Sequence, residues 1–206
     1  MLKSANFCAA TGPRKRKSRK MSVRCRVAVL TSFVLCFSPW LPGNTLGQAT
    51  GGTMSFELTS TAFSAGETIP KKFTCDGLDV SPRLSWGDPP AKTQSFALVM
   101  DDPDAPAGTW VHWVLYDVLA DAKELPESVP KQEQLSNGAW QGRNDFGKIG
   151  YGGPCPPPGK PHRYFFKLYA LDSKLRLKAG ATKADLERAM KGHIQAQAEL
   201  IGKYGR

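Results

Sequence analysis

Three polar fragments interrupt stretches that otherwise have the composition of buried strands. The run 101–106 (DDPDAP) follows one apolar stretch, His112 lies in the middle of the next, and the triplet 162–164 (HRY) opens a third. Carboxylate, imidazole and phenol groups hydrogen-bond small ions and exchange protons. If the fragments meet, they form a small polar pocket at the strand ends.

Each fragment also has a purely structural explanation. The Asp-Pro-Asp-Ala-Pro sequence is typical of a turn in which aspartate side chains cap backbone amides. His112 could be a core histidine with satisfied hydrogen bonds, and Arg163 a surface ion-pair partner. The residues alone leave both interpretations open.

Three long apolar runs predict the strands that would carry these groups. They cover residues 93–102, 109–119 and 162–172. Strict alternation in the second run places Trp110, His112, Val114 and Tyr116 on one face, and Val111, Trp113, Leu115 and Asp117 on the other. In the third run, His162, Tyr164, Phe166 and Leu168 share a face.

The remaining elements are shorter. Residues 54–60 and 81–86 predict strands, residues 182–190 a short helix with Thr182 as N-cap, and residues 193–204 a strand rather than a helix. The Gly- and Pro-rich segment 144–161 predicts a long, stiff surface loop. This pattern indicates one mainly β domain over residues 50–206, built as a sandwich or barrel-like pair of sheets.

Residues 1–49 differ from the rest of the chain. They hold nine Lys and Arg and no Asp or Glu, and a 15-residue apolar run follows Arg26. A basic segment, an apolar segment and then small residues are typical of a signal peptide, with cleavage expected near Ala49. Met21 is an alternative start, which would make residues 1–20 an over-long beginning. The sequence therefore predicts an exported protein, periplasmic or secreted.

Residues 1–49 carry most of the net positive charge. The whole chain has a formal net charge of +10, but residues 50–206 hold 19 Lys and Arg against 18 Asp and Glu. A nearly neutral domain gives no support to nucleic-acid binding. Beyond the leader only Cys75 and Cys155 remain, a candidate disulfide in an exported domain. Two buried free thiols are the alternative.

The combination of fragments resembles a known family. The stretches "DPDAP" (102–106), "W-x-H" (110–112) and "GPCPPPGKPHRY" (153–164) are similar to the signature of the phosphatidylethanolamine-binding protein family. The bacterial, Raf kinase inhibitor-like branch is the nearest match, and "FTCDGLDVSPRLSW" (73–86) resembles the stretch before its first motif. The resemblance covers about residues 54–206.

The resemblance implies a fold and a site. The family fold is a central antiparallel β-sheet packed on a second sheet, with short peripheral helices. Members carry a small anion pocket that accepts phosphate and phospholipid head groups. Carried over by motif, the ligand-binding residues are Asp102, His112, His162, Tyr164 and Pro156, with Trp110 as an apolar rim beside His112.

Supporting roles follow for the neighbours of these residues. Asp102 can orient an imidazole and raise its pKa, and the imidazoles can donate N–H groups to phosphate. Gly152 and Gly153 allow close approach of the loop backbone and could point amides at an anion. We expect Arg163 to face away from the ligand and to brace the motif through Asp104. A disulfide between the two cysteines would stiffen the pocket rim.

The sequence favours a non-enzymatic binding protein without cofactor or metal. Family members often inhibit a kinase or a protease, and nothing in this sequence identifies such a partner or excludes a homodimer. One alternative is a protease-inhibitor-type module that acts through surface loops. Another is a weak hydrolase that uses the Asp, His and Tyr groups or a Cys155–His162 pair. The sequence contains no Gly-x-Ser-x-Gly, His-Glu-x-x-His or P-loop motif, and Asp102, His112 and His162 lack the spacing of a metal motif.

Overall fold

The computed structural model describes residues 56–206 of the 206-residue chain. The predicted signal peptide, residues 1–49, lies outside this part. The described residues belong to one compact unit. Within them, none of the helices has the length and apolar character that crossing a membrane requires.

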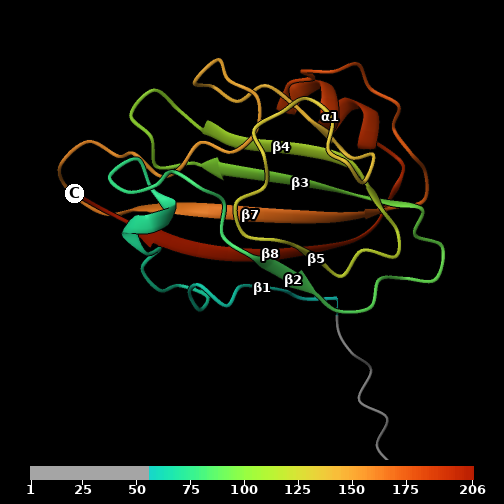
Figure 1. Ribbon diagram of the computed structural model, residues 1–206, viewed down its shortest axis with the longest axis horizontal. Helices are drawn as coiled ribbons and strands as arrows, with labels where there is room; N and C mark the ends of the chain where they lie inside the picture. Colours follow the sequence, from blue (N-terminus) through green and yellow to red (C-terminus); the bar gives the residue numbers. More distant parts are fainter. Residues whose placement is uncertain (1–55) are drawn as a thin grey trace, which may run out of the picture. The chain divides into compact units, whose positions relative to one another are not determined.

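A five-stranded antiparallel sheet forms the centre of the domain (Figure 1). Its strands, in spatial order, are β6 (Trp140–Gln141), β4 (Trp110–Leu119), β3 (Ser95–Asp102), β7 (His162–Leu171) and β8 (Ile194–Tyr204). The three long predicted strands and the strand in the tail are confirmed to within two residues at each end. All eight residues of β3 are buried, because this strand has neighbours on both edges and packed layers on both faces.

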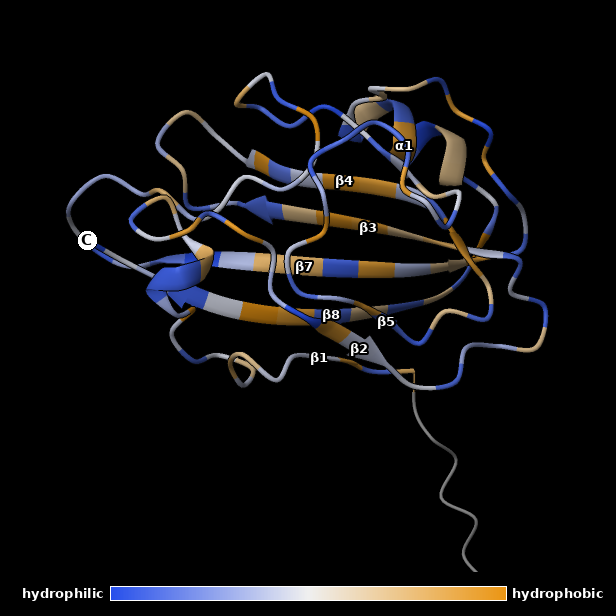
Figure 2. Ribbon diagram, viewed as in Figure 1, coloured by the Kyte–Doolittle hydropathy of each residue, from blue (hydrophilic) through white to orange (hydrophobic). Residues whose placement is uncertain are grey.

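A smaller sheet covers one face of the central sheet. It consists of β1 (Leu58–Thr59), β2 (Leu84–Trp86) and β5 (Glu124–Leu125). The larger apolar core lies on this side, and within it Trp86 meets Phe96 of β3 edge to face at 5.3 Å between ring centroids. Figure 2 shows apolar residues concentrated in the middle of β3 and β4. Within the described part of the predicted strand 54–60, β1 covers only Leu58 and Thr59.

A short helix covers the opposite face. Helix α1 (Lys183–Met190) buries Leu186 and Met190 against β3 and β4 in a second apolar cluster. Thr182 is its N-cap, as predicted, and forms a capping box with Asp185. Apart from α1, the described residues contain one 3-10 turn, η1 (Lys71–Phe73). The fold is therefore mainly β, with two antiparallel sheets, as the sequence predicts.

The prediction of strict alternation along β4 is wrong, because the pairing of β4 with β3 contains two irregularities. Met100 pairs with Trp113 but Asp101 pairs with Val111, so His112 is an extra residue on β4. Val111 packs in the helix-side cluster, whereas the His112 ring contacts Tyr164 in the core between the sheets. His112 and Trp113 therefore face the same side despite being adjacent.

The second irregularity lies at the other end of β4. Leu98 pairs with Leu115 and Phe96 with Val118, so Tyr116 and Asp117 together oppose one residue of β3. Asp117 has a positive φ of 57°. Its carboxylate accepts the backbone N–H of Leu175 on the helix side.

The Gly- and Pro-rich segment 144–161 is irregular, as predicted, but it is only partly a surface loop. Tyr151, Pro154 and Pro156 are buried. The Tyr151 hydroxyl donates to the carbonyl of Phe73 at 2.7 Å, and its ring meets Trp113 edge to face. The segment runs beside β4, and it brings its glycines and prolines to one end of the central sheet.

Candidate functional site

A cavity of about 340 Å³ opens where β3 ends and β4 and β7 begin. Five of the six predicted ligand-binding residues line it: Asp102, Trp110, His112, Pro156 and His162. The structure thus brings together residues that lie up to 60 positions apart in the chain. The antiparallel pairing of β3 with β4 and β7 explains this, because it places these strand ends side by side.

Asp102 and His162 form a buried pair in the cavity. The Asp102 Oδ2 lies 2.8 Å from the His162 Nδ1, and the two side chains are only 4% and 11% exposed. The other oxygen, Oδ1, accepts the backbone N–H of Asp104 at 2.8 Å, which fixes the carboxylate in its turn. A carboxylate only accepts, so Nδ1 of His162 carries the proton and Nε2 remains for another partner.

His112 is also held through its Nδ1. That atom lies 2.7 Å from the carbonyl oxygen of Gly152, which cannot donate, so Nδ1 carries the proton here as well. Burial lowers the pKa of His112 below 6.5, against the opposing effects of the Gly152 bond and the negative charge of Asp102. His112 is therefore neutral at pH 7, and its Nε2 is an acceptor. The prediction that both imidazoles donate to phosphate is wrong for His112 in this state.

Tyr164 does not line the cavity. It is fully buried, and its ring meets His112 edge to face at 5.2 Å between centroids. Its hydroxyl has no hydrogen-bond partner among residues 56–206. Burial, then the negative charge of Asp102, raise the pKa of Tyr164. The structure places this predicted ligand-binding residue behind His112 rather than at the cavity surface.

Gly152 and Gly153 allow close packing, as predicted, but their amides are not available to a ligand. Gly152 N–H donates to the carbonyl of His112, and Gly153 N–H to the Asp79 carboxylate. A Cβ on Gly153 would lie 2.5 Å from the carbonyl oxygen of Phe73. The expectation that these amides point at an anion is therefore wrong, because both are used to attach the loop to its neighbours.

Arg163 faces away from the cavity and pairs with Asp104. Its Nη2 lies 2.7 Å from Oδ1, and its Nε and backbone N–H both donate to Oδ2 at 2.9 Å. Hydrogen bonds from Arg163 lower the pKa of Asp104 to about 2. The pair joins the turn after β3 to the start of β7 and so holds Asp102 close to His162.

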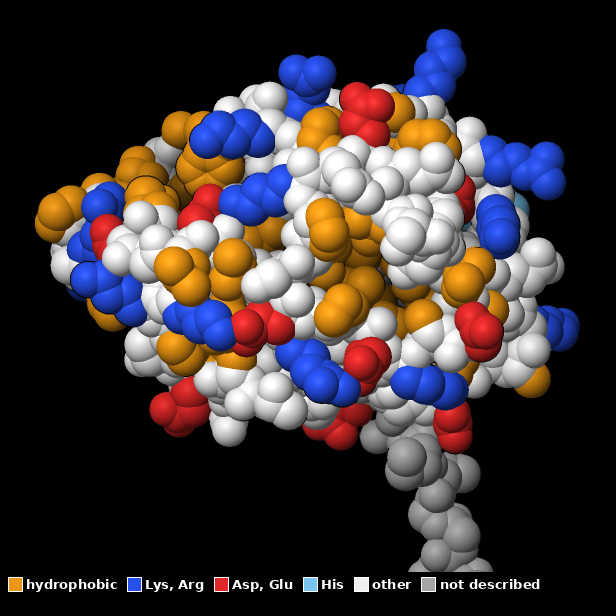
Figure 3. Space-filling view, in the orientation of Figure 1, with side chains coloured by type: hydrophobic (Ala, Val, Ile, Leu, Met, Phe, Trp, Pro, Cys, Tyr) orange, Lys and Arg blue, Asp and Glu red, His pale blue; other side chains and the backbone are white. Residues whose placement is uncertain are grey.

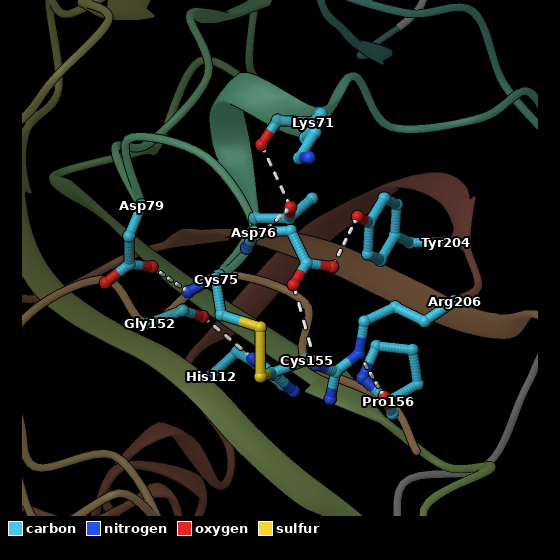
Figure 4. The surroundings of a disulfide bond; sticks show 12 residues. Lys71, Cys75, Asp76, Asp79, His112, Gly152, Cys155, Pro156, Tyr204 and Arg206 are labelled. Carbon is cyan, nitrogen blue, oxygen red and sulfur yellow. Dashed lines mark hydrogen bonds and ion pairs between the residues drawn. A yellow bond between two sulfur atoms is a disulfide. The ribbon is translucent and has the colours of Figure 1, made fainter. Parts of the chain in front are cut away.

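A disulfide joins Cys75 to Cys155 beside the cavity (Figure 4). The Cα atoms are 5.4 Å apart, and Cys155 lines the cavity. Around the disulfide, Arg206 Nε donates to the carbonyl of Pro156 at 2.8 Å, and the Tyr204 hydroxyl donates to Asp76 at 2.7 Å. The end of β8 and the segment after η1 thus hold the proline loop in place.

Sequence reasoning missed Phe146. Its ring lines the cavity and meets Trp110 and His112 edge to face, at 5.4 and 5.3 Å between centroids. The ring is 39% exposed. An aromatic residue inside a Gly-rich loop is the signal that could have identified it. Ala105, Pro106, Ala107 and Pro157 complete the apolar part of the wall.

Other sites are less convincing. A larger hollow of about 450 Å³ lies beside α1, but none of the predicted residues lines it. Among residues 56–206, no group of three His, Cys, Asp or Glu side chains could hold a metal ion. The face drawn in Figure 3 mixes positive and negative side chains without an expanse of one sign.

The sequence model of the family described as "Phosphatidylethanolamine-binding protein" matches residues 59–205. The chain belongs to this family. A relative from Aquifex aeolicus, called a UPF0098 protein, is 53% identical over 76% of this chain and 91% of its own length. Another UPF0098 protein, from Methanothermobacter thermautotrophicus, is 50% identical over 72% of this chain and 98% of its own length.

Two solved structures of the phosphatidylethanolamine-binding protein (PEBP) family have a similar fold. The homologue CT736 from Chlamydia trachomatis superposes with a TM-score of 0.68 at 43% identity, over 75% of this chain and 99% of that one. YbcL from E. coli, described as a new member of the mammalian PEBP family, gives 0.69 at 36% identity, over 73% and 98%. The described domain therefore corresponds to nearly the whole of these family members.

Proposed function

We propose that the protein is a non-enzymatic binding protein whose cavity takes phosphate or a phospholipid head group. The buried Asp102–His162 pair, which faces the cavity together with His112, carries this proposal. The name of the family, phosphatidylethanolamine-binding protein, agrees with a ligand of this class.

The hydrogen-bonding capacity of the two imidazoles suits a ligand that combines a phosphate, as acceptor, with a donor group. His162, held by Asp102 through Nδ1, donates from Nε2–H to a phosphate oxygen. His112, neutral with its proton on Nδ1, offers Nε2 as an acceptor, to which inorganic phosphate can donate an O–H and an ethanolamine head group its ammonium N–H. One ligand that both accepts and donates therefore satisfies both rings.

The size and lining of the cavity favour a ligand larger than inorganic phosphate. About 340 Å³ falls in the range of small-molecule sites, which are mostly apolar with a few placed polar groups. Trp110, Phe146 and Pro157 supply the apolar wall. A head group with a glycerol or acyl extension would cover that wall while its phosphate meets the imidazoles.

The same contacts support binding rather than catalysis. Cys155 is in the disulfide and cannot act as a nucleophile. Both oxygens of Asp102 already accept hydrogen bonds from protein groups. An attacking group would have to come from solvent or from the ligand.

We also propose that the protein is exported. The leader-like pattern of residues 1–49 and the disulfide support this location, because disulfides persist in oxidising compartments. A kinase or a protease as partner stays a hypothesis drawn from the family resemblance alone.

A calorimetric titration tests the binding proposal. Purified residues 50–206 are titrated with inorganic phosphate and with glycerophosphoethanolamine at several pH values from 5 to 8, beside the His162→Ala variant. We expect saturable binding of both ligands, because the Asp102–His162 pair can form a charge-assisted hydrogen bond with a phosphate oxygen. The variant should bind at least tenfold more weakly. Absence of saturable binding, or equal affinity in the variant, would refute the cavity as the ligand site.

A further inference from the structure

A second cavity adjoins the first. It has a volume of about 220 Å³, and Phe146 and Cys155 belong to the walls of both cavities. The wall of the second cavity also includes Tyr151, Gly152 and Gly153. Three charged residues line it as well: Asp79, Lys131 and Lys148. Phe146 and Cys155 therefore separate a cavity lined by two histidines from one lined by two lysines.

The charged groups of the second cavity leave one cation without an anion. Asp79 is engaged twice, because Oδ2 accepts from Lys131 at 2.7 Å and Oδ1 accepts the Gly153 N–H at 2.6 Å. Among the residues that the structure describes, no carboxylate pairs with Lys148, which also lines this cavity. The second cavity thus has a net positive charge.

A tight turn carries both Phe146, whose ring belongs to the walls of the two cavities, and the unpaired Lys148. The side-chain oxygen of Asn144 accepts the backbone N–H groups of Phe146 and Lys148 at 3.1 and 3.0 Å. The Asn144 amide donates to the carbonyl of Gly150 at 2.9 Å, and the Asn144 side chain is buried. Phe146 also packs closely on Gly152, where an added Cβ would lie 2.7 Å from the ring. The turn therefore presents an apolar ring and a cation to adjacent cavities in a fixed relation.

We propose that the second cavity is a subsite for a carboxylate on the same ligand whose phosphate occupies the cavity at Asp102 and His162. The ligand class is a small phosphodiester with a second acidic group, of which the phosphoserine head group is the simplest example. Phe146 contacts the segment between the two groups, and Lys148 pairs with the carboxylate. This inference rests on the proposed function, since it needs phosphate in the first cavity.

Matched ligands test the subsite. Glycerophosphoethanolamine and glycerophosphoserine differ only by the carboxylate, and N-succinyl-glycerophosphoethanolamine carries a carboxylate at a longer reach. We expect one or both acidic probes to bind residues 50–206 about fivefold more tightly than glycerophosphoethanolamine, the size of a partly exposed ion pair. The advantage should shrink as salt rises from 0.05 to 0.5 M, because salt screens exposed charges.

Three variants test whether Lys148 causes the tighter binding of the acidic probes. Lys148→Gln should remove the advantage of the acidic probe and leave the affinity for inorganic phosphate within twofold of the original. Lys148→Arg should preserve the advantage, and Lys160→Gln, an exposed lysine that lines neither cavity, should change nothing. Equal affinities for all three phosphodiesters, or an advantage that survives Lys148→Gln, would overturn the subsite. If no probe or phosphate bound at all, the proposed function itself would fail.

Discussion

Asp101 and Asp102 are adjacent, buried carboxylates with opposite environments. Asp101 faces the helix side of the sheet, where Lys167 of β7 and Lys183 of α1 both pair with it, at 2.9 and 2.5 Å. Asp102 faces the cavity and pairs with a single imidazole. Their exposed fractions are 0% and 3%, so burial alone does not distinguish them.

The partner of each carboxylate decides what it can do. Asp101 pairs with one lysine from β7 and one from α1, and so it ties β3, β7 and α1 together. Asp102 pairs with an imidazole that lines the cavity and keeps its Nε2 for a ligand. The first carboxylate is suited to holding the fold, and the second is suited to a site.

Asp101→Asn should show the largest loss of stability. Removing one partner of a buried ion pair leaves charge uncompensated, at a typical cost of about 3–5 kcal/mol. Lys167 and Lys183 are partly exposed and can turn toward water, so we expect about 2–3 kcal/mol from urea unfolding at pH 7. Phosphate affinity should stay within twofold of the original. Asp121→Asn, at an exposed residue with no ion pair in the described part of the chain, is the control. A loss equal to that of the control would mean that Asp101 does not tie the elements together.

Asp102→Asn should have the opposite profile, with a large loss of phosphate affinity and a small loss of stability. An amide cannot balance a protonated His162, so phosphate affinity at pH 6 should fall at least tenfold in a calorimetric titration. Unfolding free energy should fall by only about 1 kcal/mol, the size of one hydrogen bond, because the isosteric amide keeps an acceptor for Asp104 N–H. If this variant lost more stability than Asp101→Asn while still binding phosphate, the division of roles would be wrong.

The ionisation of His112 should have the smallest effect on stability, visible as a pH dependence of unfolding. Its folded-state pKa is lowered by burial, so between that value and 6.5 the unfolded chain binds more protons than the folded one. Stability should therefore fall as pH drops below 6.5 through the folded-state pKa of His112. Urea unfolding of wild type and His112→Gln between pH 4.5 and 7.5 should show a shallower acid loss in the variant.

The NMR signals of the imidazole protons provide the complementary measurement. The chain has three histidines, and His193→Gln identifies the signal of the exposed one. The signal that His112→Gln removes should titrate below 6.5. If that signal titrates at or above 6.5, the assignment of His112 as a neutral acceptor at pH 7 is wrong.

The strands could be predicted because a buried strand needs apolar residues, and these are visible in the sequence. The stretches around β3 and β4 are apolar at nearly every position, as strands buried on both faces require, whereas β7 alternates between buried and more exposed residues. The capping box at Thr182 is likewise a local pattern with a local cause. The resemblance to the family motifs then identified five residues that line the cavity.

The rest depends on contacts that no local pattern records. The extra residue at His112 shifts the β3–β4 register, and only the pairing itself shows the shift. Gly152 and Gly153 have the composition of an anion-binding loop, but their amides donate to His112 and Asp79, which lie far away in sequence. Phe146 gains its role only from the turn that Asn144 closes.

The pairing of β3 with β7 also has a kinetic consequence. β3 and β4 form a local hairpin, whereas Asp102 and His162 are 60 residues apart and meet only when the much later strand β7 joins β3. Pairing over such separations is slow, because the loss of chain entropy precedes the gain in contacts. Until then Asp102 is an ordinary carboxylate at the end of a hairpin. The capacity to bind an anion should therefore appear as one of the last events of folding, and the rate at which it appears reports the arrival of β7.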